Sequence, residues 1–296
     1  MPHSLRFLRL SSALGLAIPT MVLAQPSALG TFTTFNFPGA GYTQARYLES
    51  SGEVVGFYFD GPAFASPAHG FLRSKDGELS SIDFPGTQGT TLATGINSEG
   101  DIVGYYGAGG TTHGFRRAKD GEFTSLDYPG ATGTQAWGIN SSGDIVGVYS
   151  VGVQTHGFVL DKNGEFTGVD FSGAAYTEAF AINSEGDIVG QYGAGGTTHG
   201  FVLSKDGGFS SFDVPGPINA AAGTQTRGIS DRGNIVGWFV TSSGTRRGYL
   251  LRQGQFTFID CPSSTSTTDS DGINSEGDIV GGCVDAQGHH AYVLIR

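Results

Sequence analysis

The phrase Gly95-Ile-Asn-Ser-Glu-Gly-Asp-Ile-Val-Gly104 recurs along the chain and decides the fold. A second full copy runs from Gly138 to Gly147, and related copies occupy residues 47–56, 181–190, 228–237 and 272–281. The closing glycines stand at positions 56, 104, 147, 190, 237 and 281, so the repeat has a period of roughly 44 residues. A fixed period of this length indicates that the chain is an array of similar structural units.

Two further phrases complete each unit. His113-Gly114-Phe115 follows the first phrase, and Asp120 to Gly130 closes the unit. Counterparts of the histidine phrase begin at His69, His156, His199, Arg247 and His290. The second unit predicts strands at 91–97, 101–107, 112–118 and 122–129, separated by Gly-containing turns. Four short antiparallel strands per unit, with no sustained helical period, are typical of a β-propeller blade.

The two ends of the chain complement each other. The last unit stops at Arg296 after its third strand, and the phrase expected of its fourth strand stands instead at Phe32 to Gly39. We therefore predict an all-β, six-bladed β-propeller with four antiparallel strands per blade, closed by the N-terminal strand 31–38. The predicted propeller domain spans 25–296, with blades at about 42–86, 91–130, 134–173, 177–216, 224–262 and 268–296.

These phrases carry a family resemblance. The sequences His113-Gly114-Phe115 and His290-Ala291-Tyr292, each after an Asn-Ser-x-Gly-Asp-Ile-Val-Gly phrase, resemble the HAF family of extracellular repeats. The resemblance covers essentially residues 31–296 and implies export and repeat architecture. It implies no established activity and no catalytic residues, so none is transferred to this chain.

The N-terminus and the composition bear on location and partners. Arg6 and Arg9 precede an apolar stretch, and small residues end it, so residues 1–24 are predicted to be a signal peptide cut after Ala24. We therefore expect a secreted or periplasmic protein, and a monomer. The net charge of -11 argues against nucleic acid, because phosphates need clustered cations. No later stretch is long and apolar enough to predict membrane insertion.

The recurrent histidines and the Asn-Ser-Glu-Gly-Asp turns invite a metal hypothesis. Equivalent histidines of successive blades lie too far apart to share an ion, so we expect them to hydrogen-bond recurrent acids instead. The expected partners are Asp83, Asp127, Asp170, Asp213 and Asp260. The turns lack the alternating acids of a calcium loop and are interpreted as hairpin turns. We expect no metal and no cofactor, and no catalytic residue is identified.

Cys261 and Cys283 are the only cysteines. In an alignment of the repeats, Cys261 takes the place of residues such as Phe84 and Tyr128, and Cys283 takes the place of residues such as Tyr106 and Tyr149. One apparent aromatic pair is thus replaced by two cysteines at a single junction between neighbouring units. We predict a Cys261–Cys283 disulfide, which an oxidising compartment permits, with a pair of reactive thiols as the alternative.

The units differ most in the strand that opens each blade. This strand carries a recurrent threonine and, on its other face, variable residues that we expect to converge on the axial channel. The candidate ligand-binding residues are Gln44, Arg46, Gln135, Trp137, Glu178, Phe180, Gln225, Arg227, Asp269 and Asp271. Leu92 and Thr94 hold the equivalent positions of the second unit. The alternative is that these side chains form a salt-linked plug of the channel.

The leading functional hypothesis is an exported, non-enzymatic binding module for a polysaccharide, a peptide or a surface protein. One alternative is a secreted propeller hydrolase, lactonase or lyase that uses Glu178, Asp269 and Asp271 at the channel mouth. Another is a structural spacer in a surface layer, which a plugged channel would favour. A propeller fold supports all three functions, so the site has to decide between them.

Overall fold

The structure, a computed structural model, describes residues 29–61, 67–87, 89–216, 218–219, 221–262 and 264–296. These residues form strands β1 to β24, and no α-helix occurs among them. Within the same residues, therefore, no helix is long and apolar enough to cross a membrane. The predicted signal peptide, residues 1–24, lies outside the described residues.

The second sequence unit forms one antiparallel sheet in chain order, as its phrases predict. Its strands are β6 (Thr91–Ile96), β7 (Ile102–Ala108), β8 (Thr111–Arg117) and β9 (Phe123–Leu126). The recurrent Asn-Ser-x-Gly phrase is the turn between the first two strands, and Gly100 there has a φ of 86°. Because such a φ is strained for other residues, the turn requires glycine.

The other units repeat this order. The third and fourth units form β10 (Gly133–Ile139), β11 (Ile145–Val151), β12 (Gln154–Leu160), β13 (Phe166–Val169), β14 (Tyr176–Ile182), β15 (Ile188–Ala194), β16 (Thr197–Leu203) and β17 (Phe209–Phe212). The remaining strands are β1 (Thr31–Phe35), β2 (Tyr42–Leu48), β3 (Val54–Phe59), β4 (Ala68–Arg73), β5 (Leu79–Ile82), β18 (Thr224–Ile229), β19 (Ile235–Val240), β20 (Arg246–Arg252), β21 (Gln255–Ile259), β22 (Thr267–Ile273), β23 (Ile279–Asp285) and β24 (Gly288–Ile295).

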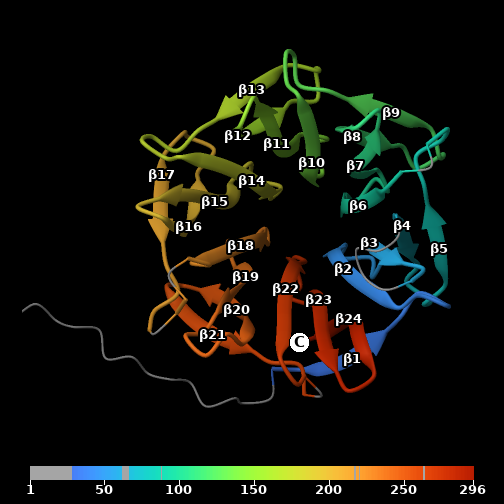
Figure 1. The fold of residues 1–296 in the computed structure, drawn as a ribbon, viewed down its shortest axis with the longest axis vertical. Coiled ribbons are helices and arrows are strands. Elements are labelled where there is room, and N and C mark those ends of the chain that lie inside the picture. Colours follow the sequence, from blue (N-terminus) through green and yellow to red (C-terminus); the bar gives the residue numbers. More distant parts are fainter. Residues whose placement is uncertain (1–28, 62–66, 88, 217, 220, 263) are drawn as a thin grey trace, which may run out of the picture.

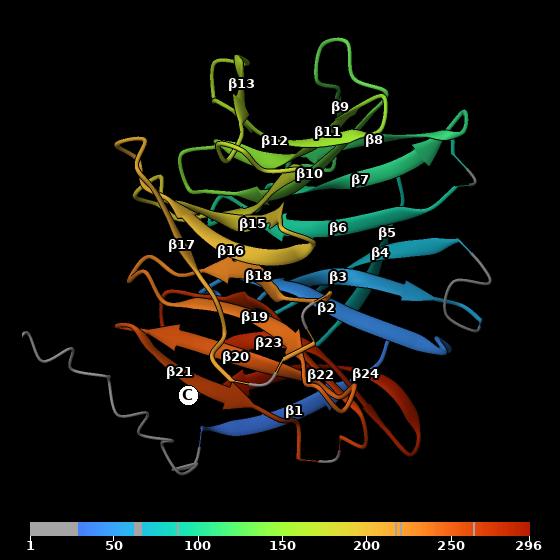
Figure 2. The ribbon, with the colours of Figure 1, turned by 60° about the vertical axis from the view of Figure 1, so that its left-hand side comes forward.

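The N-terminal strand pairs with the end of the chain, as predicted. Strand β1 is antiparallel to β24, with Thr31 opposite Ile295 and Phe35 opposite Ala291. Figure 2 shows the blue β1 lying along the red C-terminal strands. The last unit therefore also has four strands, with the order β22-β23-β24-β1.

The sheets lie around a common centre (Figure 1), with the first strand of each unit innermost. Each of these strands contacts the next, in the order β2, β6, β10, β14, β18 and β22, and β22 contacts β2. Two single-residue parallel bridges, Arg246 to Thr267 and Tyr42 to His289, also join three units into a twelve-stranded sheet. The other three units are separate four-stranded sheets.

The hydrophobic core is divided among the spaces between neighbouring sheets. Val103 of the second unit, for example, packs in one cluster with Ala136, Ile139 and Phe158 of the third. The aromatic residue of each histidine phrase is fully buried in such a cluster; these residues are Phe71, Phe115, Phe158, Phe201, Tyr249 and Tyr292. A repeat of this kind is stabilised mainly by contacts with its neighbours, so each unit depends on the unit next to it.

The recurrent closing glycine of the first phrase allows this packing. A Cβ atom on Gly104 would lie 1.9 Å from the carbonyl oxygen of Leu92 and 2.8 Å from the ring of Phe115. The same clash would occur at Gly147, 2.1 Å from the carbonyl oxygen of Gln135. Only glycine leaves room for the neighbouring strand and the buried ring at this place.

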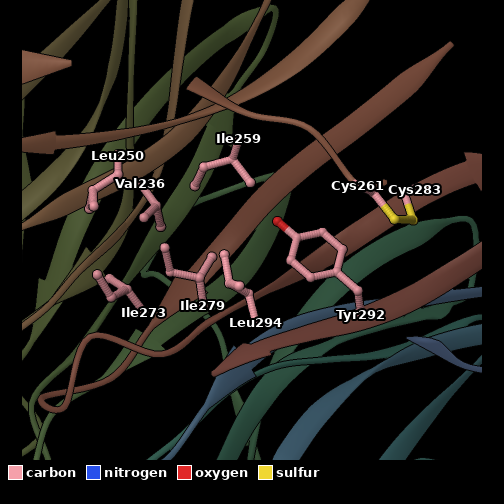
Figure 3. Close-up of a cluster of buried hydrophobic side chains, with 9 residues drawn as sticks. All are labelled: Val236, Leu250, Ile259, Cys261, Ile273, Ile279, Cys283, Tyr292 and Leu294. Atoms are coloured by element: carbon pink, nitrogen blue, oxygen red, sulfur yellow. A yellow bond between two sulfur atoms is a disulfide. The ribbon is translucent and has the colours of Figure 1, made fainter. Parts of the chain in front are cut away.

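The two positions that carry cysteine at the last interface between units touch at other interfaces, as the alignment predicts. Phe84 and Tyr106 stack with ring centroids 3.6 Å apart, and Tyr128 and Tyr149 do the same at 3.6 Å. In the last interface the pair is the disulfide Cys261–Cys283, which confirms the predicted bond. Figure 3 shows the two cysteines at one side of a buried cluster that includes Tyr292.

Removal of this disulfide should destabilise the protein by about 3 kcal/mol, the chain-entropy value for a loop of this size. The bond joins residues that are 22 positions apart in the sequence. The Cys261→Ser/Cys283→Ser variant should show this loss in urea-induced unfolding under non-reducing conditions. Cys261→Phe/Cys283→Tyr is the matched variant, because it restores the stacked pair of the other units and should recover part of the loss. Equal stability of the serine variant and the wild type would contradict the prediction.

Candidate functional site

Five of the ten candidate ligand residues lie together where the innermost strands meet. Each first strand has a β-bulge at the same place, for example between Ala45 and Tyr47, so the period-2 alternation breaks there. We call the six bulge residues the hub: Arg46, Thr94, Trp137, Phe180, Arg227 and Asp271. With Tyr47 and Ala181 they surround a cavity of only about 10 Å³. Such a volume holds at most about one water molecule.

One side of the hub is an ion pair. Nη1 of Arg46 lies 3.3 Å from Oδ2 of Asp271, and the Asp271 side chain is 2% exposed. The side-chain amide of Gln44 donates to the same carboxylate oxygen. Oδ1 of Asp271 and Nε of Arg46 have no hydrogen-bond partner among the described residues. Because a buried charge is expensive to leave unpaired, Asp271 depends on Arg46.

The other cation of the hub is held by aromatic rings. The guanidinium carbon of Arg227 lies 4.2 Å from the ring centroid of Phe180 and 6.0 Å from that of Trp137. Its Nη1 donates to Oε1 of Gln191 at 3.5 Å, and no ion pair to Arg227 occurs among the described residues. Burial lowers the pKa of Arg227, and the nearby charge of Arg46 lowers it further. Cation–π contact thus takes the place of the salt link that the plug hypothesis expects.

The remaining candidate residues lie one step along the same strands and are also paired. Trp137 Nε1 donates to Gln135 at 3.2 Å, and the Gln191 amide donates to Glu178 at 2.6 Å. The amide of Gln225 donates to the carbonyl oxygen of Ala222 at 2.6 Å. Asp269 forms an ion pair with Arg246, 3.0 Å away. Every candidate residue of this layer therefore has a partner within the protein.

Several side chains of this region were not identified from the sequence. Gln191, Trp238, Arg246 and His289 reach it from strands other than the innermost ones. Trp238 is the cross-strand partner of Gln225, and the Arg246 guanidinium lies 4.1 Å from the Trp238 ring centroid. A signal for Gln191 did exist, because residues 97–115 and 183–201 differ only at Tyr105 and Gln191.

Asp269 and His289, near the junction of the first and last units, have pKa values shifted toward each other's range. Burial raises the pKa of Asp269 from 3.8 to about 6; Asp271 raises it further and Arg246 opposes the shift. Burial lowers the pKa of His289 from 6.5 to about 4, against a hydrogen bond with the carbonyl oxygen of Thr43. The His289 ring also stacks on Tyr42 at 3.8 Å.

These shifts predict opposite pH dependences of stability. Folded Asp269 keeps its proton to higher pH than the unfolded chain, so its contribution to the free energy of unfolding falls between pH 4 and 6. Folded His289 loses its proton at lower pH, so its contribution rises between pH 4 and 6.5. We therefore compare the free energy of unfolding of Asp269→Asn and of His289→Gln with that of the wild type at each pH. The two differences should change with pH in opposite directions, each by up to about 1.4 kcal/mol per pH unit. Urea unfolding across pH 4–7 measures them, and a pH-independent difference would contradict the assignment.

The recurrent histidines have the partners that were expected. His69, His113 and His156 each place Nδ1 2.8 Å from a carboxylate oxygen of Asp83, Asp127 and Asp170, respectively. His199 pairs with Asp213, and Arg247 takes the histidine's place beside Asp260. His290 differs, because it contacts Asn36 of the N-terminal segment and Asp285.

The Asn-Ser-Glu-Gly-Asp turns use their side chains internally. Oδ1 of Asn97 accepts the backbone N–H of Asp101 at 2.9 Å, and Asn183 does the same for Asp187. This supports the interpretation as hairpin turns. In the part of the chain that the structure describes, no group of three His, Cys, Asp or Glu side chains is placed to hold a metal ion.

A larger opening lies away from the axis. A depression of about 860 Å³ is bordered by residues 86–87, 89–90, 107–112, 132–133, 150 and 152. These residues are glycine, threonine, alanine and serine, and none of them has a titratable side chain. We call it the threonine depression. Its volume lies within the range of ~300–1,000 Å³ that is usual for ligand sites.

A second cavity, of about 390 Å³, lies at the opposite ends of the same strands. It contains charged side chains, but Arg116 and Asp101 pair with each other at 2.6 Å. Glu99, Asp161 and Lys162 line this second cavity as well, so it is a charged cavity, whereas the threonine depression is neutral.

Comparison with known proteins supports the architecture. No protein-family model and no curated protein sequence matches the chain. A streptogramin B lyase structure matches 90% of this chain and 98% of its own, with 13% identity and a TM-score of 0.53. An Aleuria aurantia lectin variant in complex with Fucα1-6GlcNAc matches 89% of this chain and 94% of its own, with 12% identity and a TM-score of 0.56. TolB from Acinetobacter baumannii matches 83% of this chain and 64% of its own, with 13% identity and a TM-score of 0.60. At these identities the likeness shows the fold alone, which is that of a β-propeller module.

Proposed function

We propose that this propeller module has six blades and is closed by its N-terminal strand. Two observations support the proposal: β1 pairs with β24, and the six innermost strands contact one another in a cycle. Closure in this way covers the strand edges that both ends of the chain would otherwise expose. The HAF resemblance, with its repeated export-associated phrases, is consistent with the same architecture.

We further propose that the protein is an exported, non-enzymatic module that binds a carbohydrate. The observation that carries this proposal is the contrast between the hub and the threonine depression. The charged hub encloses about 10 Å³, whereas the depression of about 860 Å³ offers only hydroxyl and backbone groups. Neutral donors and acceptors suit the hydroxyl groups of a saccharide and supply no acid or base for catalysis.

Other observations agree with this proposal. The Cys261–Cys283 disulfide fits an oxidising compartment outside the cytosol. The Aleuria aurantia lectin structure, which holds Fucα1-6GlcNAc, has the same type of fold. Propeller rings are rigid scaffolds, and the loops between their strands are the usual place for recognition.

A glycan array probed with the protein lacking residues 1–24 tests the proposal, with a peptide array and a calcium titration in parallel. We expect binding of neutral oligosaccharides without added calcium and no hydrolysis of the bound sugars. Failure to bind any glycan, together with peptide binding or with turnover, would reject the carbohydrate assignment.

The hub itself is a second candidate ligand site, proposed from the sequence. Trp137 of the hub and the adjacent candidate residues Gln135 and Glu178 are half-buried rather than fully enclosed, so a ligand at the channel mouth would reach them. The Trp137→Ala/Arg227→Ala variant separates the two sites. If the hub is a plug, this variant loses stability but keeps its glycan affinity, and if the hub is the ligand site, affinity is lost as well.

A further inference from the structure

Two nearly identical parts of the chain differ in whether the space beside them is filled. Residues 97–115 and 183–201 are the same except at one position, so Gly107 and Thr112 are the counterparts of Gly193 and Thr198. Beside the later copy, the chain fills this space with its own side chain. Beside the earlier copy, the same space is the threonine depression.

Tyr176 is the side chain that fills the space beside the later copy. Its ring lies against Gly193, where a Cβ atom would come within 2.2 Å of the ring. Its hydroxyl group is 2.7 Å from the hydroxyl oxygen of Thr198. The cradle of a glycine and a threonine hydroxyl therefore accommodates a six-membered ring that carries a hydroxyl group.

The earlier copy lacks this ring for two reasons. The residue at the tyrosine position is Thr90, whose hydroxyl accepts a hydrogen bond from Ala68 of the preceding sheet. The loop that leads into the first strand of the unit is also one residue longer. The backbone N–H of Phe84 donates to the hydroxyl of Thr91, seven positions later, whereas that of Phe171 donates to the hydroxyl of Thr177, six positions later. Gly107 is consequently uncovered, since a Cβ atom there would have no neighbour closer than 3.9 Å.

We propose that the threonine depression is the saccharide site and that a pyranose ring occupies the place that Tyr176 takes in the later copy. This inference rests on the proposed carbohydrate-binding function and gives it a location. The sugar ring lies on Gly107, and a ring hydroxyl bonds to Thr112, whose hydroxyl has no partner among the described residues. Thr111, Thr132 and Ser150 border the same space and provide further neutral polar groups.

The exposed rim of the depression favours one kind of sugar substituent. Val151 is 50% exposed and Val153 is fully exposed, and both stand beside the lining residue Gly152 at the tip of the β11–β12 hairpin. The equivalent tips, Ala108–Thr111 and Ala194–Thr197, carry alanine, glycine and threonine instead. A sugar with a methyl-bearing substituent, such as a 6-deoxy or N-acetyl group, would cover these valines and gain apolar contact.

The Gly107→Phe variant tests the location, because its ring would project into the depression without a clash. Gly168→Phe is the matched control, since it makes the same substitution at an exposed site on strand β13. The probes are chitotetraose, a fucose-terminated oligosaccharide and mannotetraose, titrated by calorimetry. We expect Gly107→Phe to weaken binding of the methyl-bearing probes at least about 10-fold, which corresponds to 1.4 kcal/mol, and Gly168→Phe to leave it unchanged.

A second variant covers the case in which Gly107→Phe does not fold. Thr112→Val keeps the shape of the side chain but removes its hydroxyl group, and it should weaken binding about 3- to 10-fold, as for loss of one hydrogen bond. Wild-type affinity in either folded variant would overturn the location while leaving the proposed function intact. Absence of binding by the wild-type protein itself would instead reject the function. Binding of a tyrosine-containing peptide in place of the sugars would overturn the assignment of the ligand.

Discussion

Deletion of residues 31–38 should lower the free energy of unfolding by roughly 4 kcal/mol or more. Loss of a single buried aromatic side chain typically costs about 3–5 kcal/mol, and this deletion removes several aromatic contacts at once. The deleted segment pairs along β24 from Thr31 to Phe35. Its aromatic rings also pack across two interfaces. Phe37 stacks on Tyr58 at 3.7 Å, and Phe32 lies 5.3 Å from Tyr292. The deletion would expose these partners and the edge of β24 together.

Thermal and urea-induced unfolding of the deletion variant measure this loss. Phe32→Ala/Phe35→Ala should reproduce much of it, whereas Thr31→Ala/Thr34→Ala alters only exposed side chains of the same strand and serves as the control. A synthetic peptide of residues 29–40, added in excess, should restore stability, because it binds the folded state at the vacated edge. An unchanged unfolding transition in the deletion variant would refute closure by the N-terminal strand.

The sequence predicts the repeated parts of this structure well, because the same packing contacts require the same residue types in each repeat. Gly104 recurs since a carbonyl group and a buried ring leave no room for a Cβ atom. The aromatic pairs recur in the alignment because they stack between neighbouring units, and this regularity made the exchange to Cys261 and Cys283 interpretable. Six aligned copies thus act as internal comparisons for one another.

The parts that the sequence does not predict arise where units interact with different neighbours. Arg246 and His289 enter the central region from β20 and β24, which are not the innermost strands of their units. The bulge at Arg46 alters the alternation on which the strand analysis depended. The threonine depression lies where the chain has one additional loop residue and has Thr90 in place of a tyrosine. The sequence shows both changes, but only the position of the neighbouring sheet shows that they leave a space open.

Replacement of Arg46 with methionine should destabilise the protein by about 3–5 kcal/mol, the range found when one partner of a buried ion pair is removed. Methionine keeps much of the apolar stem of the arginine but leaves the carboxylate of Asp271, 2% exposed, with only the amide of Gln44. The exposed residue Arg252 provides a control, and Arg252→Met should change stability by less than about 0.5 kcal/mol.

The double variant Arg46→Met/Asp271→Leu distinguishes a closed hub from an open one. In a closed hub the two charges are desolvated, so their joint replacement by apolar side chains should restore stability to near the wild-type value or above it. In an open hub, water would solvate Asp271, and the single Arg46→Met variant would lose less than about 1 kcal/mol, as for an exposed ion pair. Denaturant midpoints of the three proteins decide between these outcomes. A large loss with rescue means that the hub is structural filler, which leaves the threonine depression as the proposed ligand site and the structural spacer as the alternative function.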